Sequence, residues 1–370
     1  MTNARGSSRR DFLASSLALA GLTWIKESPL DEALLYVGTY TENIYVLRMD
    51  PGSGELRSIG SLAAGPNPSF LATHPKLRIV YAVNEVEAGT VRAVKTLAEQ
   101  SSRGSSPCYV SVDRTGQVLL VANYDSGSVA LLPLQPDGTP ETATSMIQHQ
   151  GHGPVADRQS GPHAHCILAD PSNRFALAAD LGADRVFVYQ LDLAAKALRH
   201  VDGADAVMRP GAGPRHLAFH PTLPLVFVAN ELDSTVATLR FDAERGALTP
   251  IDTQSTLPAG WSGTNYPADI HVAPSGRTLY VSNRGHNSIA VFAVAATGGG
   301  ELSLVQTVPT QGDWPRNFTL DPSGRWLLAA NQRSNSIVVF ARDAASGKLM
   351  PAGKQISVPS PVCLRFAPWS

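Results

Sequence analysis

The 370-residue chain has only three cysteines, Cys108, Cys166 and Cys363. Their spacing matches neither a metal-binding motif nor a disulfide framework, and each lies in an apolar run, so we expect three buried free thiols. The chain also lacks an excess of charge of one sign, since its formal net charge is −1. Without a basic field it has no electrostatic footprint for nucleic acid or for an anionic membrane surface, and neither is expected as a partner.

Long hydrophobic runs are also missing. The longest candidate, ASSLALAGLTWI, is too short for a comfortable membrane span and follows the paired arginines Arg9 and Arg10. Paired arginines before a short apolar run are typical of a twin-arginine export signal. We therefore expect residues 1–32 to be an export signal and linker, with the twin-arginine translocase as a partner during export. The mature protein would then be periplasmic, with no membrane contact after export; a disordered tail is the alternative.

The chain shows no serine nucleophile elbow, Walker loop, dinucleotide fingerprint or haem motif. It has a repeat instead. Seven segments of the form Pro-x-x-apolar, spaced 39 to 55 residues apart, begin at Pro68, Pro107, Pro162, Pro214, Pro267, Pro315 and Pro361. A period of this length, built from short alternating strands, is typical of a β-propeller with one blade per repeat. The sequence therefore predicts an all-β, seven-bladed β-propeller over residues 33–370.

Each repeat has the same internal order. An alternating strand follows the proline, a second strand ends in Asn or Asp, and a third and a weaker fourth strand follow. This order predicts four-stranded antiparallel blades. The segment LLYVGTYT near the N-terminus has no first strand before it, and the last repeat, PVCLRFAP, has nothing after it. We expect these N- and C-terminal strands to share one blade, which closes the ring and removes the open sheet edges.

A propeller gathers equivalent positions of its blades around one axis, so two sets of residues are candidates for a site at the central mouth. The residues directly after the repeat prolines are Ser69, Cys108, His163, Arg215, Ala268, Arg316 and Val362. The residues directly after the second strands are Tyr40, Glu85, Tyr124, Leu181, Glu231, Arg284 and Gln332. Purely structural positions would favour similar residues in all blades. The variety and charge of these two sets indicate a binding site.

One histidine interrupts an otherwise apolar set. The third residues after the prolines are Leu71, Val110, His165, Leu217, Ile270, Phe318 and Leu364. A lone histidine is usually a satisfied core residue, but His163 lies two positions away on the predicted same strand face, which favours a functional pair. His-x-His is also a common metal-ligand spacing. No further ligand set is visible in the sequence, so we expect no metal.

The arginines of the two sets allow two interpretations. Arg215, Arg284 and Arg316 either form structural ion pairs with Glu85 and Glu231, or leave a surplus of positive charge at the mouth. Such a surplus suits an anionic substrate or a developing oxyanion. Glu231 either orients an arginine or acts as a general base.

Several motifs resemble one known family. The segments LYVGTYT, YAVNE, GPHAH, GAGPRHLAFHP, NEL, SNRG and PRNF are similar to the seven-bladed propeller lactonases, which include bacterial 6-phosphogluconolactonases and fungal carboxymuconate-lactonizing enzymes. The resemblance covers residues 33–368. It implies a site without cofactor at the central mouth that acts on a lactone or its open acid. Matching the motifs one by one implies these catalytic residues: His163 or His165, Arg215, Glu231 and Arg284.

The two sets add candidates for substrate binding, namely Glu85, Tyr124, Arg316 and Gln332. The function implied is hydrolysis of a sugar-type lactone. A phosphorylated sugar lactone is not expected in the periplasm, so the export signal favours an unphosphorylated aldonolactone. Two alternatives stay open, a carboxymuconate-type cycloisomerase and a binding platform without catalysis, since a fold alone does not fix function.

Overall fold

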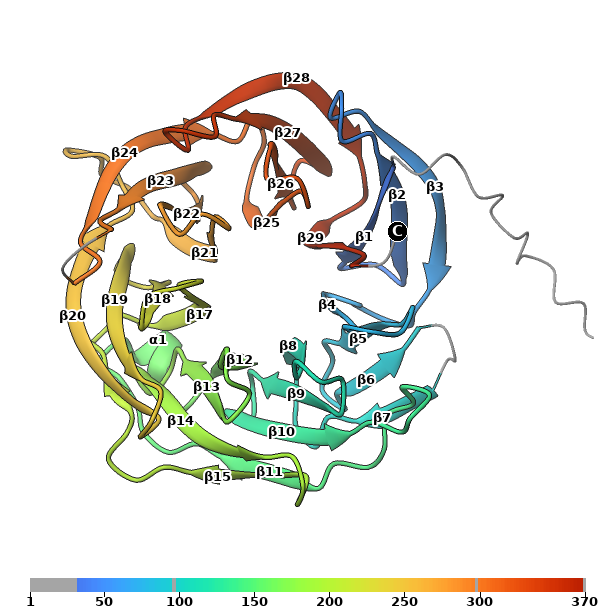
Figure 1. Cartoon of the computed structure of the whole chain (residues 1–370), viewed down its shortest axis with the longest axis vertical. Helices are drawn as coiled ribbons and strands as arrows, with labels where there is room; N and C mark the ends of the chain where they lie inside the picture. The colour runs from blue at the N-terminus through green and yellow to red at the C-terminus, as the bar shows by residue number, and fades with distance from the viewer. Residues whose placement is uncertain (1–31, 95–97, 297–298, 369–370) are drawn as a thin grey trace, which may run out of the picture. The chain divides into compact units, whose positions relative to one another are not determined.

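The computed structural model describes residues 32–94, 98–296 and 299–368. These residues form seven antiparallel sheets around a central axis, each with four strands on its main path (Figure 1). The predicted seven-bladed β-propeller is confirmed. The predicted export signal falls on residues 1–31, which lie outside the described part of the chain, and it stays a prediction. Among the described residues, no helix has the length and hydropathy needed to cross a bilayer.

One blade joins the two ends of the chain, as predicted. Its strands, from the axis outward, are β29 (Pro361–Phe366), β1 (Ala33–Thr39), β2 (Asn43–Met49) and β3 (Leu56–Ala63). Val37 of β1 pairs with Leu364 of β29 in antiparallel register. Both side chains are fully buried, and they share a hydrophobic cluster with Leu35. The last strand of the chain therefore completes the sheet that the first strands begin.

The other six blades follow in chain order, and in each the strand nearest the axis comes first (Figure 1). The next three are β4 (Phe70–Thr73), β5 (Val80–Asn84), β6 (Thr90–Ala93), β7 (Ala98–Ser101); β8 (Pro107–Val112), β9 (Val118–Asn123), β10 (Ser128–Pro133), β11 (Ser145–Gln148); and β12 (Ala164–Ala169), β13 (Phe175–Asp180), β14 (Arg185–Asp192), β15 (Ala197–His200), with β16 (Ala206–Val207) also paired to β14. A single short helix, α1 (Ala156–Gln159), precedes β12 in this part of the chain.

The last three complete blades are β17 (Pro214–Phe219), β18 (Leu225–Asn230), β19 (Thr235–Asp242), β20 (Ala247–Ser255); β21 (Tyr266–Val272), β22 (Thr278–Arg284), β23 (Ser288–Val294), β24 (Leu302–Pro309); and β25 (Pro315–Leu320), β26 (Trp326–Asn331), β27 (Ser336–Arg342), β28 (Leu349–Ser357). Second strands such as β9 and β18 are buried along their whole length, because neighbouring blades cover both faces. Outer strands such as β28 alternate between exposed and half-buried residues. This difference explains why the fourth strands give the weakest sequence pattern.

Most of the innermost strands carry a β-bulge that shapes the site. Pairing skips one residue between Pro107 and Tyr109, and the same shift recurs in β17 and β25. A bulge leaves one residue unpaired and redirects its side chain. The unpaired residues of these three strands are Cys108, Arg215 and Arg316, so the bulge brings the residue after the repeat proline toward the axis.

The register corrects the predicted alignment of the third repeat. In β12, Ala164 pairs with Asp180, just as Pro214 pairs with Asn230 in the next blade, and each pairing is followed by a bulge. The unpaired residue of β12 is therefore His165. It is His165, and not His163, that is equivalent to the bulge residues of the other blades.

The apolar position assigned to His165 belongs to Ile167. Ile167 pairs with Ala178, as Leu217 pairs with Val228 one blade later. In the segment Gly-Pro-His-Ala-His, the proline therefore lies two positions before the strand residue that is equivalent to Pro214. The prediction that a histidine interrupts the apolar set was wrong.

Candidate active site

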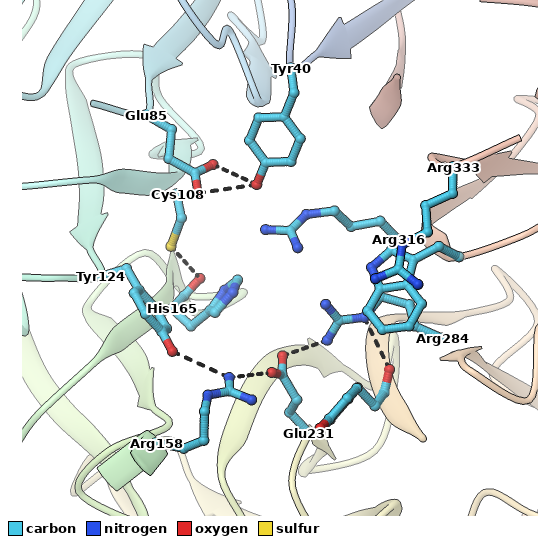
Figure 2. Close-up of a pocket in the computed structure, with 12 residues that line it drawn as sticks. Tyr40, Glu85, Cys108, Tyr124, Arg158, His165, Glu231, Arg284, Arg316 and Arg333 are labelled. Carbon is cyan, nitrogen blue, oxygen red and sulfur yellow. Dashed lines mark hydrogen bonds and ion pairs between the residues drawn. The ribbon is translucent and has the colours of Figure 1, made fainter. Parts of the chain in front are cut away.

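A cavity of about 520 Å³ lies at the centre of the ring (Figure 2). Its walls are formed by Tyr40, Glu85, Cys108, Tyr124, Arg158, His165, Glu231, Tyr266, Arg284, Trp314, Arg316 and Arg333. Six of the nine residues predicted for the site are among them: Glu85, Tyr124, His165, Glu231, Arg284 and Arg316. The bulges and the turns after the second strands supply these six, because both lie at the same end of each blade.

The other three predicted residues lie elsewhere. Arg215 is 2% exposed and lines a smaller cavity that shares Cys108 and Arg316 with the main one. His163 stacks on Tyr124 with ring centres 4.5 Å apart, so it supports the wall that Tyr124 forms. Gln332 lines neither cavity, and its buried Oε1 has no hydrogen-bond partner.

Three arginines converge on the carboxylate of Glu231. Arg158 Nη2 donates to Oε1 over 2.6 Å, and Arg284 Nη2 donates to Oε2 over 2.6 Å. Arg215 Nε lies 2.9 Å from Oε2 as an ion pair without hydrogen-bond geometry. Burial alone would raise the pKa of Glu231, but the three guanidinium groups outweigh it and hold the pKa well below its usual range. The geometry favours the first interpretation of Glu231, an ionised group that orients arginines, because guanidinium groups already occupy both of its oxygens.

Arg158 was not predicted from the sequence. It lies on α1, in the long connection between the second and third complete blades, and its Nη2 also lies 3.3 Å from the hydroxyl of Tyr124. The next residue, Gln159, is fully buried and donates to Leu181 O over 2.8 Å and to Asp184 Oδ1 over 2.7 Å. These bonds fix α1 against the third complete blade. Arg158 therefore reaches the cavity from a helix that is held in place.

His165 has an unusual environment for a pocket residue. It is 4% exposed, and its Nδ1 is buried without a hydrogen-bond partner. The rings of Tyr124 and His216 meet it edge to face, with centres 5.5 and 5.2 Å away. Burial, and secondly the charge of Arg215, hold the pKa of His165 well below its usual range. The imidazole is therefore neutral and able to accept a proton.

A buried chain of polar groups runs beneath the cavity. Arg215 Nη1 lies 3.3 Å from His216 Nε2, and His216 Nδ1 lies 2.8 Å from Asp269 Oδ1. Burial lowers the pKa of His216 to about 3, so this ring is neutral. A neutral ring that donates from Nδ1 to a carboxylate has Nε2 free to accept, which matches a donor at Arg215. Asp269 thus fixes the tautomer of His216, and His216 in turn helps to fix Arg215.

The opposite wall carries a second carboxylate and a free cation. The hydroxyl of Tyr40 donates to both oxygens of Glu85, at 3.0 and 3.1 Å. The guanidinium of Arg316 lies over the ring of Tyr40, 5.2 Å from its centre. In the described part of the chain it forms no ion pair or hydrogen bond, so its N–H donors face the cavity (Figure 2).

The cavity wall carries Arg158, Arg284, Arg316 and Arg333 against two carboxylates, a surplus of positive charge. No three His, Cys, Asp or Glu side chains of the described residues gather in a geometry that could hold a metal ion. The arrangement therefore offers guanidinium donors beside a neutral imidazole. Such a set can hold an anion or a developing oxyanion while a proton is taken up nearby.

Comparison with known proteins agrees with the fold and the motifs. Residues 34–366 match the family model described as lactonase, 7-bladed beta-propeller. The chain is 37% identical to a 6-phosphogluconolactonase of Bacillus subtilis, over 90% of this chain and 97% of that protein. It is 32% identical to a 6-phosphogluconolactonase of Serratia proteamaculans, over 85% and 93% of the two chains.

A solved structure, that of the periplasmic gluconolactonase of Pseudomonas aeruginosa, is 32% identical and superposes with a TM-score of 0.83. The superposition covers 91% of this chain and 99% of the other. The match to the family model extends over all seven blades, and the same blades supply the cavity walls. This chain is a member of the seven-bladed β-propeller lactonase family.

Proposed function

We propose that this protein hydrolyses a sugar-type lactone in the central cavity. The observation that carries the proposal is His165, a neutral imidazole that lines the cavity in a wall rich in guanidinium groups. Hydrolysis of a lactone needs a proton acceptor for water and donors for the carbonyl oxygen, and this wall offers both. The relatives named 6-phosphogluconolactonase and gluconolactonase support the same reaction class.

The reaction divides into two steps. A water oxygen attacks the lactone carbonyl carbon while His165 takes the proton of that water, and the carbonyl oxygen becomes an oxyanion held by Arg284 and Arg316. The intermediate then collapses, the bond from the carbonyl carbon to the ring oxygen breaks, and His165 returns the proton to the leaving oxygen. The product is an open hydroxy acid. Arg215 acts from below, through its ion pair with Glu231.

We propose further that the protein is exported and that its substrate is an unphosphorylated aldonolactone. The paired arginines Arg9 and Arg10 support export, and a relative described as a periplasmic gluconolactonase supports both parts. Oxidation of sugars outside the cytoplasm is the class of reaction that would supply such a lactone.

Replacing His165 by Asn should lower kcat about 10²–10⁴-fold, because positioned general bases contribute that much. The measurement is acid release from glucono-δ-lactone, followed with a pH indicator at slightly acidic pH and corrected for the spontaneous rate. Arg215→Ala should also lose most turnover while staying folded by circular dichroism. The exposed His152 provides the matched control, since His152→Ala should behave as the wild type.

Wild-type turnover in folded His165→Asn would refute the assignment of the base. Activity on muconates with none on sugar lactones would indicate a cycloisomerase. Saturable binding without turnover of either substrate class would indicate a binding platform.

A further inference from the structure

One residue at the rim of the cavity has a backbone conformation that its side chain disfavours. In five blades the residue before the repeat proline has a positive φ, between 42° and 66°: Asn67, Ser106, Gly213, Trp314 and Ser360. Four of these five residues are small. A bulky residue with positive φ is a conformational outlier. Such strained positions cluster at ligand sites, where the surroundings hold them in place.

The surroundings of Trp314 do hold it in place. Asn287 Oδ1 accepts from the backbone N–H of Trp314 over 2.9 Å, and Asn287 Nδ2 donates to Asp313 Oδ1 over 2.9 Å. The N–H of Gln332 donates to Trp314 O over 3.0 Å. The indole therefore has a fixed position in the cavity wall, where the ring of Tyr266 meets it edge to face. The two rings form a rigid aromatic surface on one side of the cavity.

Arg333 lies on this surface. Its guanidinium carbon is 3.5 Å from the centre of the Trp314 ring, and the residue is exposed at the rim. Arg158 and Arg284 are both bound to Glu231, whereas Arg333 has no ion pair within residues 32–94, 98–296 and 299–368. Stacking on an indole restrains a guanidinium and leaves its in-plane N–H donors available. Arg333 is thus a restrained cation with unused donors at the entrance.

The donors of Arg333 are matched to a planar or tetrahedral anion. A guanidinium binds a carboxylate or a phosphate through two parallel hydrogen bonds, whereas a neutral hydroxyl group offers neither the paired acceptors nor the opposite charge. Arg284 lies 5.5 Å from the centre of the same indole and belongs to the Glu231 cluster. Trp314 therefore contacts both Arg284, which is bound to Glu231, and Arg333 at the rim. A lactone whose carbonyl is held by Arg284 would lie beside the indole that also carries Arg333.

We propose that Trp314 and Arg333 form a subsite that selects lactones carrying an anionic substituent, a carboxylate or a phosphate, away from the reacting carbonyl. The inference rests on the proposed lactone hydrolysis and adds the charge of the preferred substrate. A carboxylate satisfies both this subsite and the expectation of an unphosphorylated substrate. The preferred class would then be the lactones of sugar diacids.

The test compares kcat/KM for three lactones: neutral glucono-δ-lactone, a glucaric acid lactone with a free carboxylate, and 6-phosphoglucono-δ-lactone. The wild type should favour an anionic lactone, and the carboxylate-to-phosphate ratio identifies which anion. Arg333→Met should lower kcat/KM for the favoured anionic lactone about 10–100-fold, mainly through KM, because one charge-assisted hydrogen-bond pair is lost. For the neutral lactone, the loss of kcat/KM in Arg333→Met should be at least tenfold smaller than for the anionic lactone.

Two further variants sharpen the test. Trp314→Ser places at this position the residue that Ser106 and Ser360 provide in other blades, so it should fold at least as stably while losing the anionic preference. Arg245 is 84% exposed in its side chain and lies on the turn between β19 and β20, so Arg245→Met should keep wild-type preference.

Equal kcat/KM for the neutral and anionic lactones, or an unchanged preference in Arg333→Met, would overturn the subsite. If the wild type hydrolyses none of the three lactones, the proposed function fails separately. Calorimetric measurement of the binding of glucarate, 6-phosphogluconate and gluconate then tests the subsite independently of turnover. Equal affinity of Arg333→Met and the wild type for glucarate and for 6-phosphogluconate would overturn it.

Discussion

At the scale of single residues, burial decides which protonation states the site can use. His165 and His216 are both buried next to Arg215, and burial and positive charge disfavour the imidazolium form of each. Glu231 is buried as well, but its three arginine partners keep it ionised. Similar burial therefore gives two neutral histidines and one charged glutamate. Burial thus keeps both histidines neutral, whereas Glu231 stays charged because of its arginine neighbours.

The pH dependence of activity should reveal the neutral histidine. A general base works in its deprotonated form, so activity is lost as the pH falls through the pKa of that base. Since the pKa of His165 lies well below the ordinary value of 6.5, kcat/KM should stay high at slightly acidic pH. The measurement is kcat/KM between about pH 4 and 8. An acid limb centred at or above 6.5 would show that another group is the base.

At the scale of elements, the repeat explains what the sequence could predict. The strands, their order and the ring closure followed from recurring patterns, and so did the site residues that recur at one position per blade, such as Arg284 and Arg316. Arg158 is missing from the prediction because it lies on α1, outside the recurring strand pattern. Trp314 directly precedes a repeat proline and Arg333 directly follows Gln332, so both fall just outside the two sets that were compared. The misalignment of His165 has a physical cause too, since Pro162 lies two residues before the strand position that Pro214 occupies in the next blade.

Helix α1, in the connection between β11 and β12, should be rigidly held, and releasing it should lower activity. Gln159→Ala removes two buried hydrogen bonds and should cost about 2–3 kcal/mol of unfolding free energy. It should also lower kcat/KM, because α1 is then no longer anchored and Arg158 loses its fixed position at the cavity. Urea denaturation measures the unfolding free energy, steady-state kinetics measure kcat/KM, and hydrogen exchange of residues 150–162 reports whether α1 opens more often. The exposed Gln190 offers a control, since Gln190→Ala should change stability by less than about 0.5 kcal/mol. Unaltered exchange in Gln159→Ala would contradict this account.

At the scale of the whole molecule, the ring depends on the closing blade. β29 pairs with β1, and the cluster around Leu364 links that blade to residues of β26 and β27. Leu364→Ala should therefore destabilise the protein by about 2–5 kcal/mol, the usual cost of emptying a fully buried leucine site. Thermal and urea denaturation provide the measurement.

Met350 on the outer strand β28 is 61% exposed, so Met350→Ala should stay within about 0.5 kcal/mol of the wild type. Equal stability of the Leu364 and Met350 variants would mean that ring closure contributes little to the stability of the fold.

The closing blade also delays ring closure during protein synthesis. β29 leaves the ribosome after the six complete blades, yet it lies innermost in the sheet that holds β1, β2 and β3. The hydrogen bond from Leu71 N–H to Cys363 Sγ joins residues 292 positions apart. Contacts at such separation form late, and until they form β1 keeps an unpaired edge. A nascent chain whose translation stops early cannot close its ring, so its open strand edge leaves it exposed to aggregation and proteolysis.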